Sequence, residues 1–185
     1  FADSAAGLPW YIQGTNQYSV NPTISVSKTA ANEPVYWIAW QQNSSTGSSS
    51  DIYYKQITVH TNGTFSQSGA MMSGGSGYPH NRYPTITSIG NSARVAWQGY
   101  VGYIEDGMPK ENAEEMEESR VIFKSTDYWQ YWQFGNNVYK PNINRHDAEN
   151  GYIFAWSQNN GQAVYFANNT TLSTISTISG IQGID

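Results

Sequence analysis

A tryptophan-centred segment occurs three times in this chain at nearly constant spacing. In each copy an aliphatic or aromatic residue precedes Ala-Trp, and a small polar pair follows it. The tryptophans are Trp40, Trp97 and Trp156, which lie 57 and 59 residues apart. A fixed period of this size is typical of repeat architectures, in which each copy forms one structural unit. The spacing therefore predicts about three similar units in one chain.

Each copy also contains short runs of β-branched and aromatic residues on both sides of its tryptophan. The run before it is led by a proline, and these prolines are Pro22, Pro84 and Pro141. The third and fourth runs lie at 51–55, 120–124 and 163–167, and near 64–71, 129–134 and 171–181. Gly, Asn, Ser and Thr separate the runs, which is the pattern of strands and turns. We therefore expect four strands in each unit.

Four antiparallel strands in a repeated unit form the blade of a β-propeller. The sequence predicts an all-β chain, a single partial propeller over 1–185, with blades at about 18–72, 82–134 and 138–181. Each proline fits the start of an innermost strand, where its missing N–H costs little. The Ala-Trp strand should be second in its blade and buried on both faces. A β-sandwich is the alternative, but a sandwich has no reason to repeat its sequence.

Three blades make an incomplete ring, because known propellers close with about four to eight. Either the native protein is longer, or two copies of the chain associate into a six-bladed ring. Further blades of the same protein or a second copy are thus expected partners. Residues 1–16 form either an outer strand of another blade or a tail packed on the first blade. Because the sequence starts at Phe1 and not at Met, we expect a mature or truncated piece.

The composition indicates a secreted or surface-displayed protein. Charged residues make up only 12% of the chain and aromatic residues 15%, so polar uncharged residues must cover the surface. The net charge of −5 and the scattered basic residues argue against nucleic-acid binding. No apolar run approaches the length of a membrane span. The absence of cysteine excludes disulfides and thiolate metal sites.

The loop between the second and third strands of the middle blade, 99–119, is enlarged and acidic. It holds seven of the 14 acidic residues of the chain. Pro109 followed by 110–116 predicts a short helix. The insertion is either a site for a cation or basic partner, or a solvated acidic loop. Asp147 to Gly151 could hold Ca²⁺ in a turn but lacks the full ligand series of a calcium loop, so we expect no cofactor, with Ca²⁺ the weakly supported exception.

The end of the middle blade resembles a known motif. In the segment 125–132, Ser125, Asp127 and Trp132 match the Asp-box of the sialidase-like β-propellers, although Trp129 stands where that motif has glycine. The resemblance covers about residues 17–180 and implies the propeller fold, with the Asp-box as a structural turn.

The resemblance also bears on catalysis. Arg82-Tyr83-Pro84 matches the Arg-x-Pro with which sialidases bind the substrate carboxylate. Those enzymes also need three arginines, a Tyr–Glu pair and an Asp. This chain has four arginines in total, and no Tyr–Glu pair can be placed by motif. We therefore expect a relative of the non-enzymatic kind.

Three functions remain open. The first is a non-catalytic module that binds a glycan or a protein partner; the others are a glycoside hydrolase of the sialidase-like group and a structural module of a filament, sheath or virion surface. Long loops on a rigid scaffold favour binding, and tyrosines can stack on sugar rings. The expected ligand-binding residues, around the start of the middle blade, are Tyr78, His80, Arg82, Tyr100, Tyr103, Glu105 and Asp106. Alternatively, these tyrosines only pack the loops.

Overall fold

The fold is taken from a computed structural model of the chain. It describes residues 18–45, 49–72, 78–100, 104–105, 108–109, 119–126, 131–134, 138–146, 151–158, 163–168 and 176–178. All regular structure within these ranges is β-strand, and all but one of the strand pairs are antiparallel. The all-β prediction is therefore confirmed. The segments 1–16 and 110–116, for which an outer strand and a helix are expected, lie outside the described residues.

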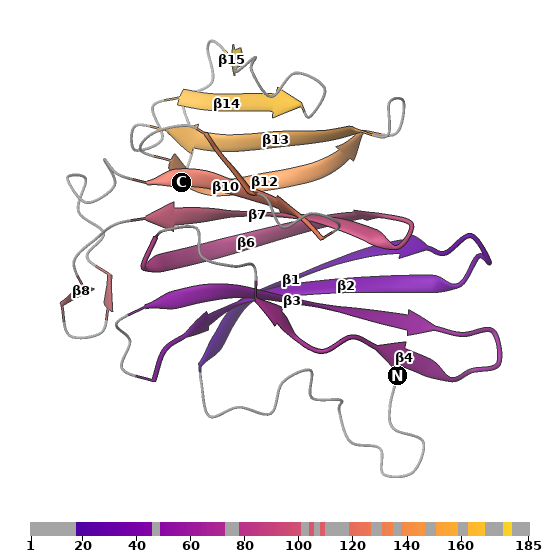
Figure 1. Cartoon of the computed structure of the whole chain (residues 1–185). Helices are drawn as coiled ribbons and strands as arrows, with labels where there is room; N and C mark the ends of the chain where they lie inside the picture. The colour runs from indigo at the N-terminus through magenta and orange to yellow at the C-terminus, as the bar shows by residue number, and fades with distance from the viewer. Residues whose placement is uncertain are drawn as a thin grey trace.

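The strands form three groups that follow one another along the chain and from bottom to top of Figure 1. Group 1 contains β1 (Ser19–Lys28), β2 (Pro34–Asn43), β3 (Ser50–Val59), β4 (Phe65–Gln67) and β5 (Met71–Met72). Group 2 contains β6 (His80–Ile89), β7 (Ser92–Tyr100), β10 (Arg120–Ser125) and β11 (Tyr131–Phe134). Group 3 contains β12 (Val138–His146), β13 (Gly151–Gln158), β14 (Ala163–Asn168) and β15 (Ser176–Ile178). The short strands β8 (Ile104–Glu105) and β9 (Met108–Pro109) pair with each other inside the β7–β10 insertion.

Groups 1 and 2 are joined by a single parallel bridge, Ser50 to His80, whereas group 3 is a separate four-stranded sheet. The described strands form no closed sheet. Within each group the strands follow in sequence order, because tight antiparallel connections suffice between neighbours. Strands are present at every expected run, and the three groups start and end within a few residues of the expected blades.

The first two strands of every group pair in the same register. Ala39, Ala96 and Ala155 on the second strands lie opposite Thr23, Thr85 and Asn142 on the first strands. Just before these pairs each first strand has one residue more than its partner, so all three contain a β-bulge at the same position. The registers therefore match in the three groups.

The bulge surrounds the leading proline of each first strand. The residue before it has a positive φ in all three groups: 51° at Asn21, 52° at Tyr83 and 42° at Lys140. Such angles cost a residue other than glycine about 1–3 kcal/mol. Because proline has no N–H to donate, the ladder must be interrupted there, and the bulge absorbs the interruption. The prolines thus lie inside their strands, not at the starts where the sequence placed them.

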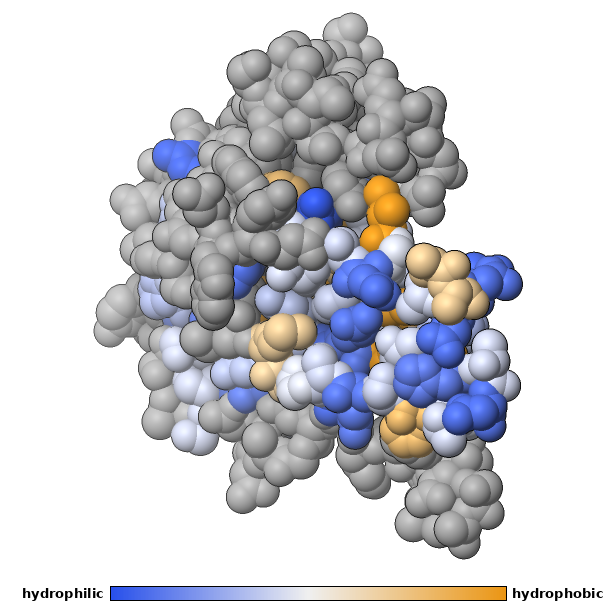
Figure 2. All heavy atoms as spheres, turned by 45° about the vertical axis from the view of Figure 1, so that its right-hand side comes forward, coloured by the Kyte–Doolittle hydropathy of each residue, from blue (hydrophilic) through white to orange (hydrophobic). Residues whose placement is uncertain are grey.

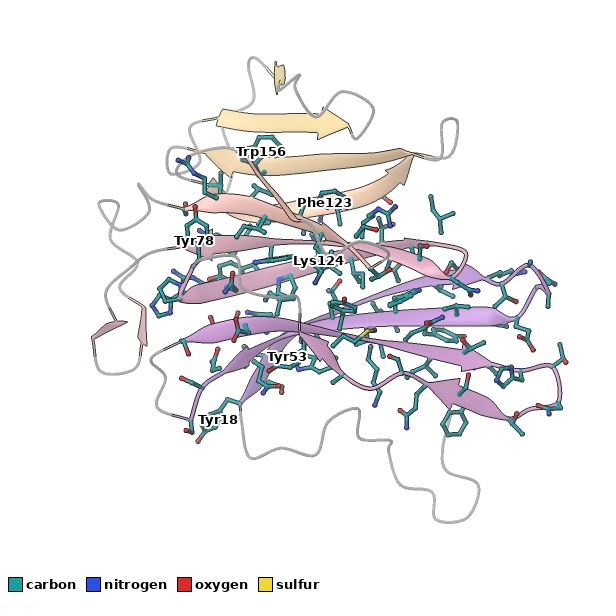
Figure 3. The ribbon with its side chains drawn as sticks, in the orientation of Figure 1. Tyr18, Tyr53, Tyr78, Phe123, Lys124 and Trp156 are labelled. Carbon is teal, nitrogen blue, oxygen red and sulfur yellow. The ribbon has the colours of Figure 1, made fainter. Side chains whose placement is uncertain are left out.

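Two apolar clusters fill the spaces between the groups. β6 contacts β1 and β2 of group 1 and β12 of group 3. The first cluster joins groups 1 and 2, and its members are Val35, Trp37, Ala39, Ile52, Tyr54, Ile86, Ala93, Val95, Trp97 and Ile122. The second joins groups 2 and 3, and its members are Ala96, Val121, Phe123, Val138, Ile143 and Trp156. Figure 3 labels Phe123 and Trp156 in the layer between β10 and β13.

Successive residues of β7 enter different clusters, since side chains alternate between the faces of a strand. Val95 and Trp97 belong to the first cluster, and Ala96 belongs to the second. The Ala-Trp strand of group 2 is therefore buried on both faces, as expected. In β2, Trp37 and Ala39 are buried against group 2, while Ile38 on the other face is half-exposed.

Candidate functional site

The connections at one end of the groups are the long ones, and we call this the loop end. It comprises the β2–β3 connection (44–49), the residues that enter β6 (78–80) and the β7–β10 insertion (101–119). The bridge between Ser50 and His80 brings the starts of β3 and β6 together there, and the hairpin of β8 and β9 lies at the same end in Figure 1. The opposite end has the short turns. In Figure 2, which turns that side forward, the described residues are mostly hydrophilic, with hydrophobic ones in small separate areas.

The β6–β7 pairing gathers several of the expected ligand-binding residues at the loop end. His80 lies opposite Tyr100, and Arg82 lies opposite Gln98. Tyr78 lies two residues before β6, and Glu105 lies in β8 opposite Met108. Tyr103 and Asp106 lie outside the described residues. The pairing therefore places the backbones of Tyr78, His80, Arg82 and Tyr100 close together.

The described side chains among these expected ligand-binding residues are buried or half-buried. His80 and Arg82 are buried, and the half-buried Tyr78 packs against the first apolar cluster (Figure 3). Gly99 makes room for this packing, because a Cβ there would meet Ile122 Cδ1 and would lie 3.1 Å from Tyr78 Cδ2. Tyr78 is thus a packing residue in this structure, and a ligand-binding role for it stays a prediction.

A buried hydrogen-bond network links group 1 to group 2 below this surface. The Ser50 hydroxyl donates to the Asn81 carbonyl at 2.8 Å and accepts from the Asn81 N–H at 3.0 Å. The Asn81 side-chain amide donates to the carbonyls of Ser50 at 3.1 Å and Tyr78 at 3.0 Å. Its Oδ1 accepts from Trp97 Nε1 at 2.8 Å. Asn81 therefore holds the start of β6 against both β3 and the tryptophan strand.

The same link recurs between groups 2 and 3. The Ser119 hydroxyl donates to the Val138 carbonyl at 2.9 Å, and Gln98 Nε2 donates to the same oxygen at 2.6 Å. Ser119 precedes Val121 as Ser50 precedes Ile52, so the two serines occupy corresponding positions. Sequence reasoning missed both serines and Asn81. The available signal was a serine two residues before the apolar part of the third run in groups 1 and 2.

Positive charge gathers where β6 meets β12. The Arg82 guanidinium carbon lies 5.7 Å from the centre of the Tyr83 ring, and Lys140 Nζ lies 5.6 Å from the same centre. Both distances fit cation–π interactions. Lys140 is exposed, and Tyr83 and Lys140 are the positive-φ residues of their bulges. The bulges of two neighbouring first strands therefore place two cations on one aromatic ring.

Burial also shifts the pKa of ionisable groups on the third strands. Burial raises the pKa of Asp51, at the start of β3 near the loop end. Burial lowers the pKa of Lys124, which lies in β10 and is almost fully buried. Both shifts follow from removing a charge from water. Among the described residues no cluster of His, Asp and Glu could hold a metal ion.

The Asp-box segment is described only in part. Ser125 ends β10 and is buried, and Trp132 lies in β11 with its backbone opposite Phe123. Asp127 lies outside the described residues, as do 147–150 of the possible Ca²⁺ turn. The contacts seen here come from Thr126, whose N–H donates to the Ala93 carbonyl at 3.0 Å and whose Oγ1 accepts from the Ala93 N–H at 2.9 Å. This turn therefore fixes β10 to the start of β7.

No protein-family model matches the chain, and no curated protein is similar to it at a significant level. No helix in the part of the chain that the structure describes is long and apolar enough to cross a membrane.

Proposed function

We propose that this chain is a non-catalytic β-propeller module, related to the sialidase-like propellers, that binds a glycan or protein partner at its loop end. The observation that carries the proposal is that the first two strands pair in the same way in all three groups. Each has the same register, the same bulge and the same positive-φ residue before proline. The first strands β1, β6 and β12 contact one another in series. Successive blades around a common axis require this arrangement of innermost strands.

Binding at the loop end is supported by the combination of hydrogen-bonded strands and long connections found there. Hydrogen bonds of Ser50, Asn81 and Ser119 tie the strands together below the loop end, which supplies a rigid base. The long β7–β10 insertion, which contains β8 and β9, connects two of these strands at the loop end. Variable loops on a rigid scaffold are where binding residues concentrate.

The exposed charge of Lys140 favours an acidic ligand, either an acidic sugar or an acidic protein surface. Lys140 Nζ lies over the ring of Tyr83, which also lies beside the buried Arg82. Tyr100 is the last residue of β7 and Tyr103 follows it three residues later in the sequence, and both tyrosines would supply stacking surfaces. We place the protein outside the cell or on a cell or virion surface, consistent with its uncharged polar composition.

A glycan array combined with a panel of fluorogenic glycosides tests this function. Binding without turnover is the expected result. Turnover would instead identify a glycoside hydrolase of the sialidase-like group, and neither binding nor turnover would favour a structural module. For any ligand found, Tyr100→Ala with Tyr103→Ala should weaken binding by more than about 0.5 kcal/mol, the size of an ordinary surface substitution. A smaller change, with circular dichroism unaltered, would show that the loop end is the wrong surface.

A further inference from the structure

Three polar side chains of group 1 form a hydrogen-bonded series at the end opposite the loop end. His60 Nε2 lies 3.1 Å from Ser66 Oγ, and His60 Nδ1 lies 3.1 Å from Glu33 Oε1. Glu33 directly precedes β2, His60 directly follows β3, and Ser66 lies in β4. Both distances fall within the 2.6–3.2 Å or so at which a nucleophile, its base and an orienting group are recognised. The arrangement is therefore that of a serine, a base and an acid in series.

The hydrogen bonds fix where the protons of this series lie. A carboxylate only accepts hydrogen bonds, so Nδ1 of His60 must carry a proton to bond Glu33. In the neutral imidazole Nε2 is then an acceptor, and the Ser66 hydroxyl must donate to it. This is the tautomer in which a histidine can take a proton from a serine.

Backbone hydrogen bonds hold the acid and the base in two turns. In the β1–β2 turn, the Glu33 N–H donates to Thr29 Oγ1 at 3.1 Å, and the Thr29 N–H donates to the Glu33 carbonyl at 2.9 Å. In the β3–β4 turn, the His60 N–H donates to the Thr64 carbonyl at 2.8 Å, and the His60 carbonyl accepts from the Gly63 N–H at 2.9 Å. The imidazole and the carboxylate are therefore carried by hydrogen-bonded backbone.

Exposure decreases from the serine to the acid. Ser66 is exposed, the His60 side chain is 35% exposed and the Glu33 side chain is 19% exposed. A small electrophile in solution can therefore reach the Ser66 hydroxyl. Ser45, in the β2–β3 connection at the loop end, is exposed as well but makes no hydrogen bond to a histidine among the described residues. The two serines thus differ in whether a base is in contact.

We propose that Ser66 is a nucleophile that accepts an acyl group from an activated ester, with His60 as its base and Glu33 as the residue that orients His60. Ser66 Oγ forms a bond to the ester carbonyl carbon while its proton moves to His60 Nε2. The bond from that carbon to the alcohol or phenol oxygen then breaks, and the leaving group takes the proton from His60. The acyl group stays on Ser66, so this is a site of covalent modification, separate from the binding proposed at the loop end.

Acetylation by p-nitrophenyl acetate tests the proposal, with peptide mapping by mass spectrometry to follow Ser66 and Ser45 in the same sample. Ser66 should react at least about tenfold faster than Ser45, because a positioned base typically contributes about 10²–10⁴-fold. In denaturing urea the two serines should react at similar rates, since the contact with His60 is lost. Equal rates in the folded chain, or a difference that persists in urea, would overturn the proposal.

Two variants separate the base from the residue that orients it. His60→Gln should bring the Ser66 rate down to that of Ser45, and an unchanged Ser66 rate would contradict the role of His60. Glu33→Gln should slow Ser66 but not Ser45, because the new amide can donate to Nδ1 and so favour the other tautomer. Nitrogen NMR of the imidazole should find the proton on Nδ1 in the unmodified chain and a changed tautomer in Glu33→Gln. Circular dichroism checks folding, and Glu33→Gln carries the test if His60→Gln does not fold.

Discussion

The Ser50 hydroxyl lies 2.8 Å from the Asn81 carbonyl oxygen and 3.0 Å from the Asn81 amide nitrogen, so one buried side chain bonds both backbone groups of a residue in the next strand group. Ser119 repeats half of this arrangement, donating to Val138 at 2.9 Å. These contacts link successive groups, and among the described residues one backbone bridge joins groups 1 and 2. These hydrogen bonds therefore join the same pairs of groups that the two apolar clusters join.

Replacing Ser50 should lower the free energy of unfolding, although its side chain is small. Ser50→Ala leaves the Asn81 N–H and carbonyl with one bond fewer in a buried position, and we expect a loss of about 1–3 kcal/mol in the free energy of unfolding. Urea denaturation measures it. Ser45→Ala, at an exposed residue of the adjoining β2–β3 connection, is the control and should change stability by less than about 0.5 kcal/mol. Equal effects of the two substitutions would contradict the role of Ser50.

Two buried tryptophans differ in whether their indole N–H has a partner. Trp97 Nε1 donates to Asn81 at 2.8 Å, whereas Trp37 Nε1 has no hydrogen-bond partner among the described residues. Trp97→Phe removes ring volume and takes one buried hydrogen bond from the Asn81 Oδ1, but Trp37→Phe removes a similar volume and a donor that has no partner among the described residues. Trp97→Phe should therefore cost about 1–3 kcal/mol more in unfolding free energy. A larger loss for Trp37→Phe would contradict this account of Asn81.

Gly99 is required because two side chains approach its Cα closely. Gly99→Ala would place a methyl group against Ile122 Cδ1 and near the Tyr78 ring, and such overpacking costs about 1–3 kcal/mol. Ile122→Val removes the Cδ1 atom and alone costs about 0.5–1.5 kcal/mol. The double variant should be more stable than the sum of the two losses predicts, because the second change relieves the first. Additive losses would show that the clash is not with Ile122.

The buried Lys124 should make stability depend on pH above neutrality. Burial lowers its pKa from the ordinary value of 10.5, so the unfolded chain binds more protons than the folded one between the two pKa values. Stability due to this group therefore rises with pH across that interval. Lys124→Met removes this dependence, so the unfolding free energy of the unmodified chain should rise relative to that of the variant as the pH approaches 10.5. Urea denaturation of both proteins over a series of pH values measures the difference, and a relative fall with rising pH would be the contrary result.

The sequence predicted the strands well and their long-range contacts poorly. Apolar runs around Trp40, Trp97 and Trp156 are local signals, so the groups appear where expected. The prolines were recognised, but the bulge that places them inside a strand depends on pairing with a second strand. Ser50 and Asn81 are 31 residues apart and look like ordinary loop residues until β3 and β6 meet.

The same limit applies to the candidate site. His80 and Arg82 stood out as polar residues near long loops, yet the structure buries both at the start of β6. Ile24, Ile86 and Ile143 are equivalent as a sequence pattern. Only the packing of neighbouring groups shows that the first of them is exposed and the other two are buried.

The side-by-side packing of the first strands is the central claim, and an engineered disulfide tests it most directly. The Ser25 and Ser88 hydroxyl oxygens, on β1 and β6, lie 2.9 Å apart, and the chain has no cysteine to interfere. The double variant Ser25→Cys with Ser88→Cys should lose both free thiols on mild oxidation of the folded protein, as measured by thiol titration and intact mass. Ser25→Cys with Thr64→Cys, whose second position lies in the β3–β4 turn, should keep both. Two thiols that stay free in the folded Ser25–Ser88 variant would contradict the packing of β1 against β6, and with it the arrangement of the groups as successive blades.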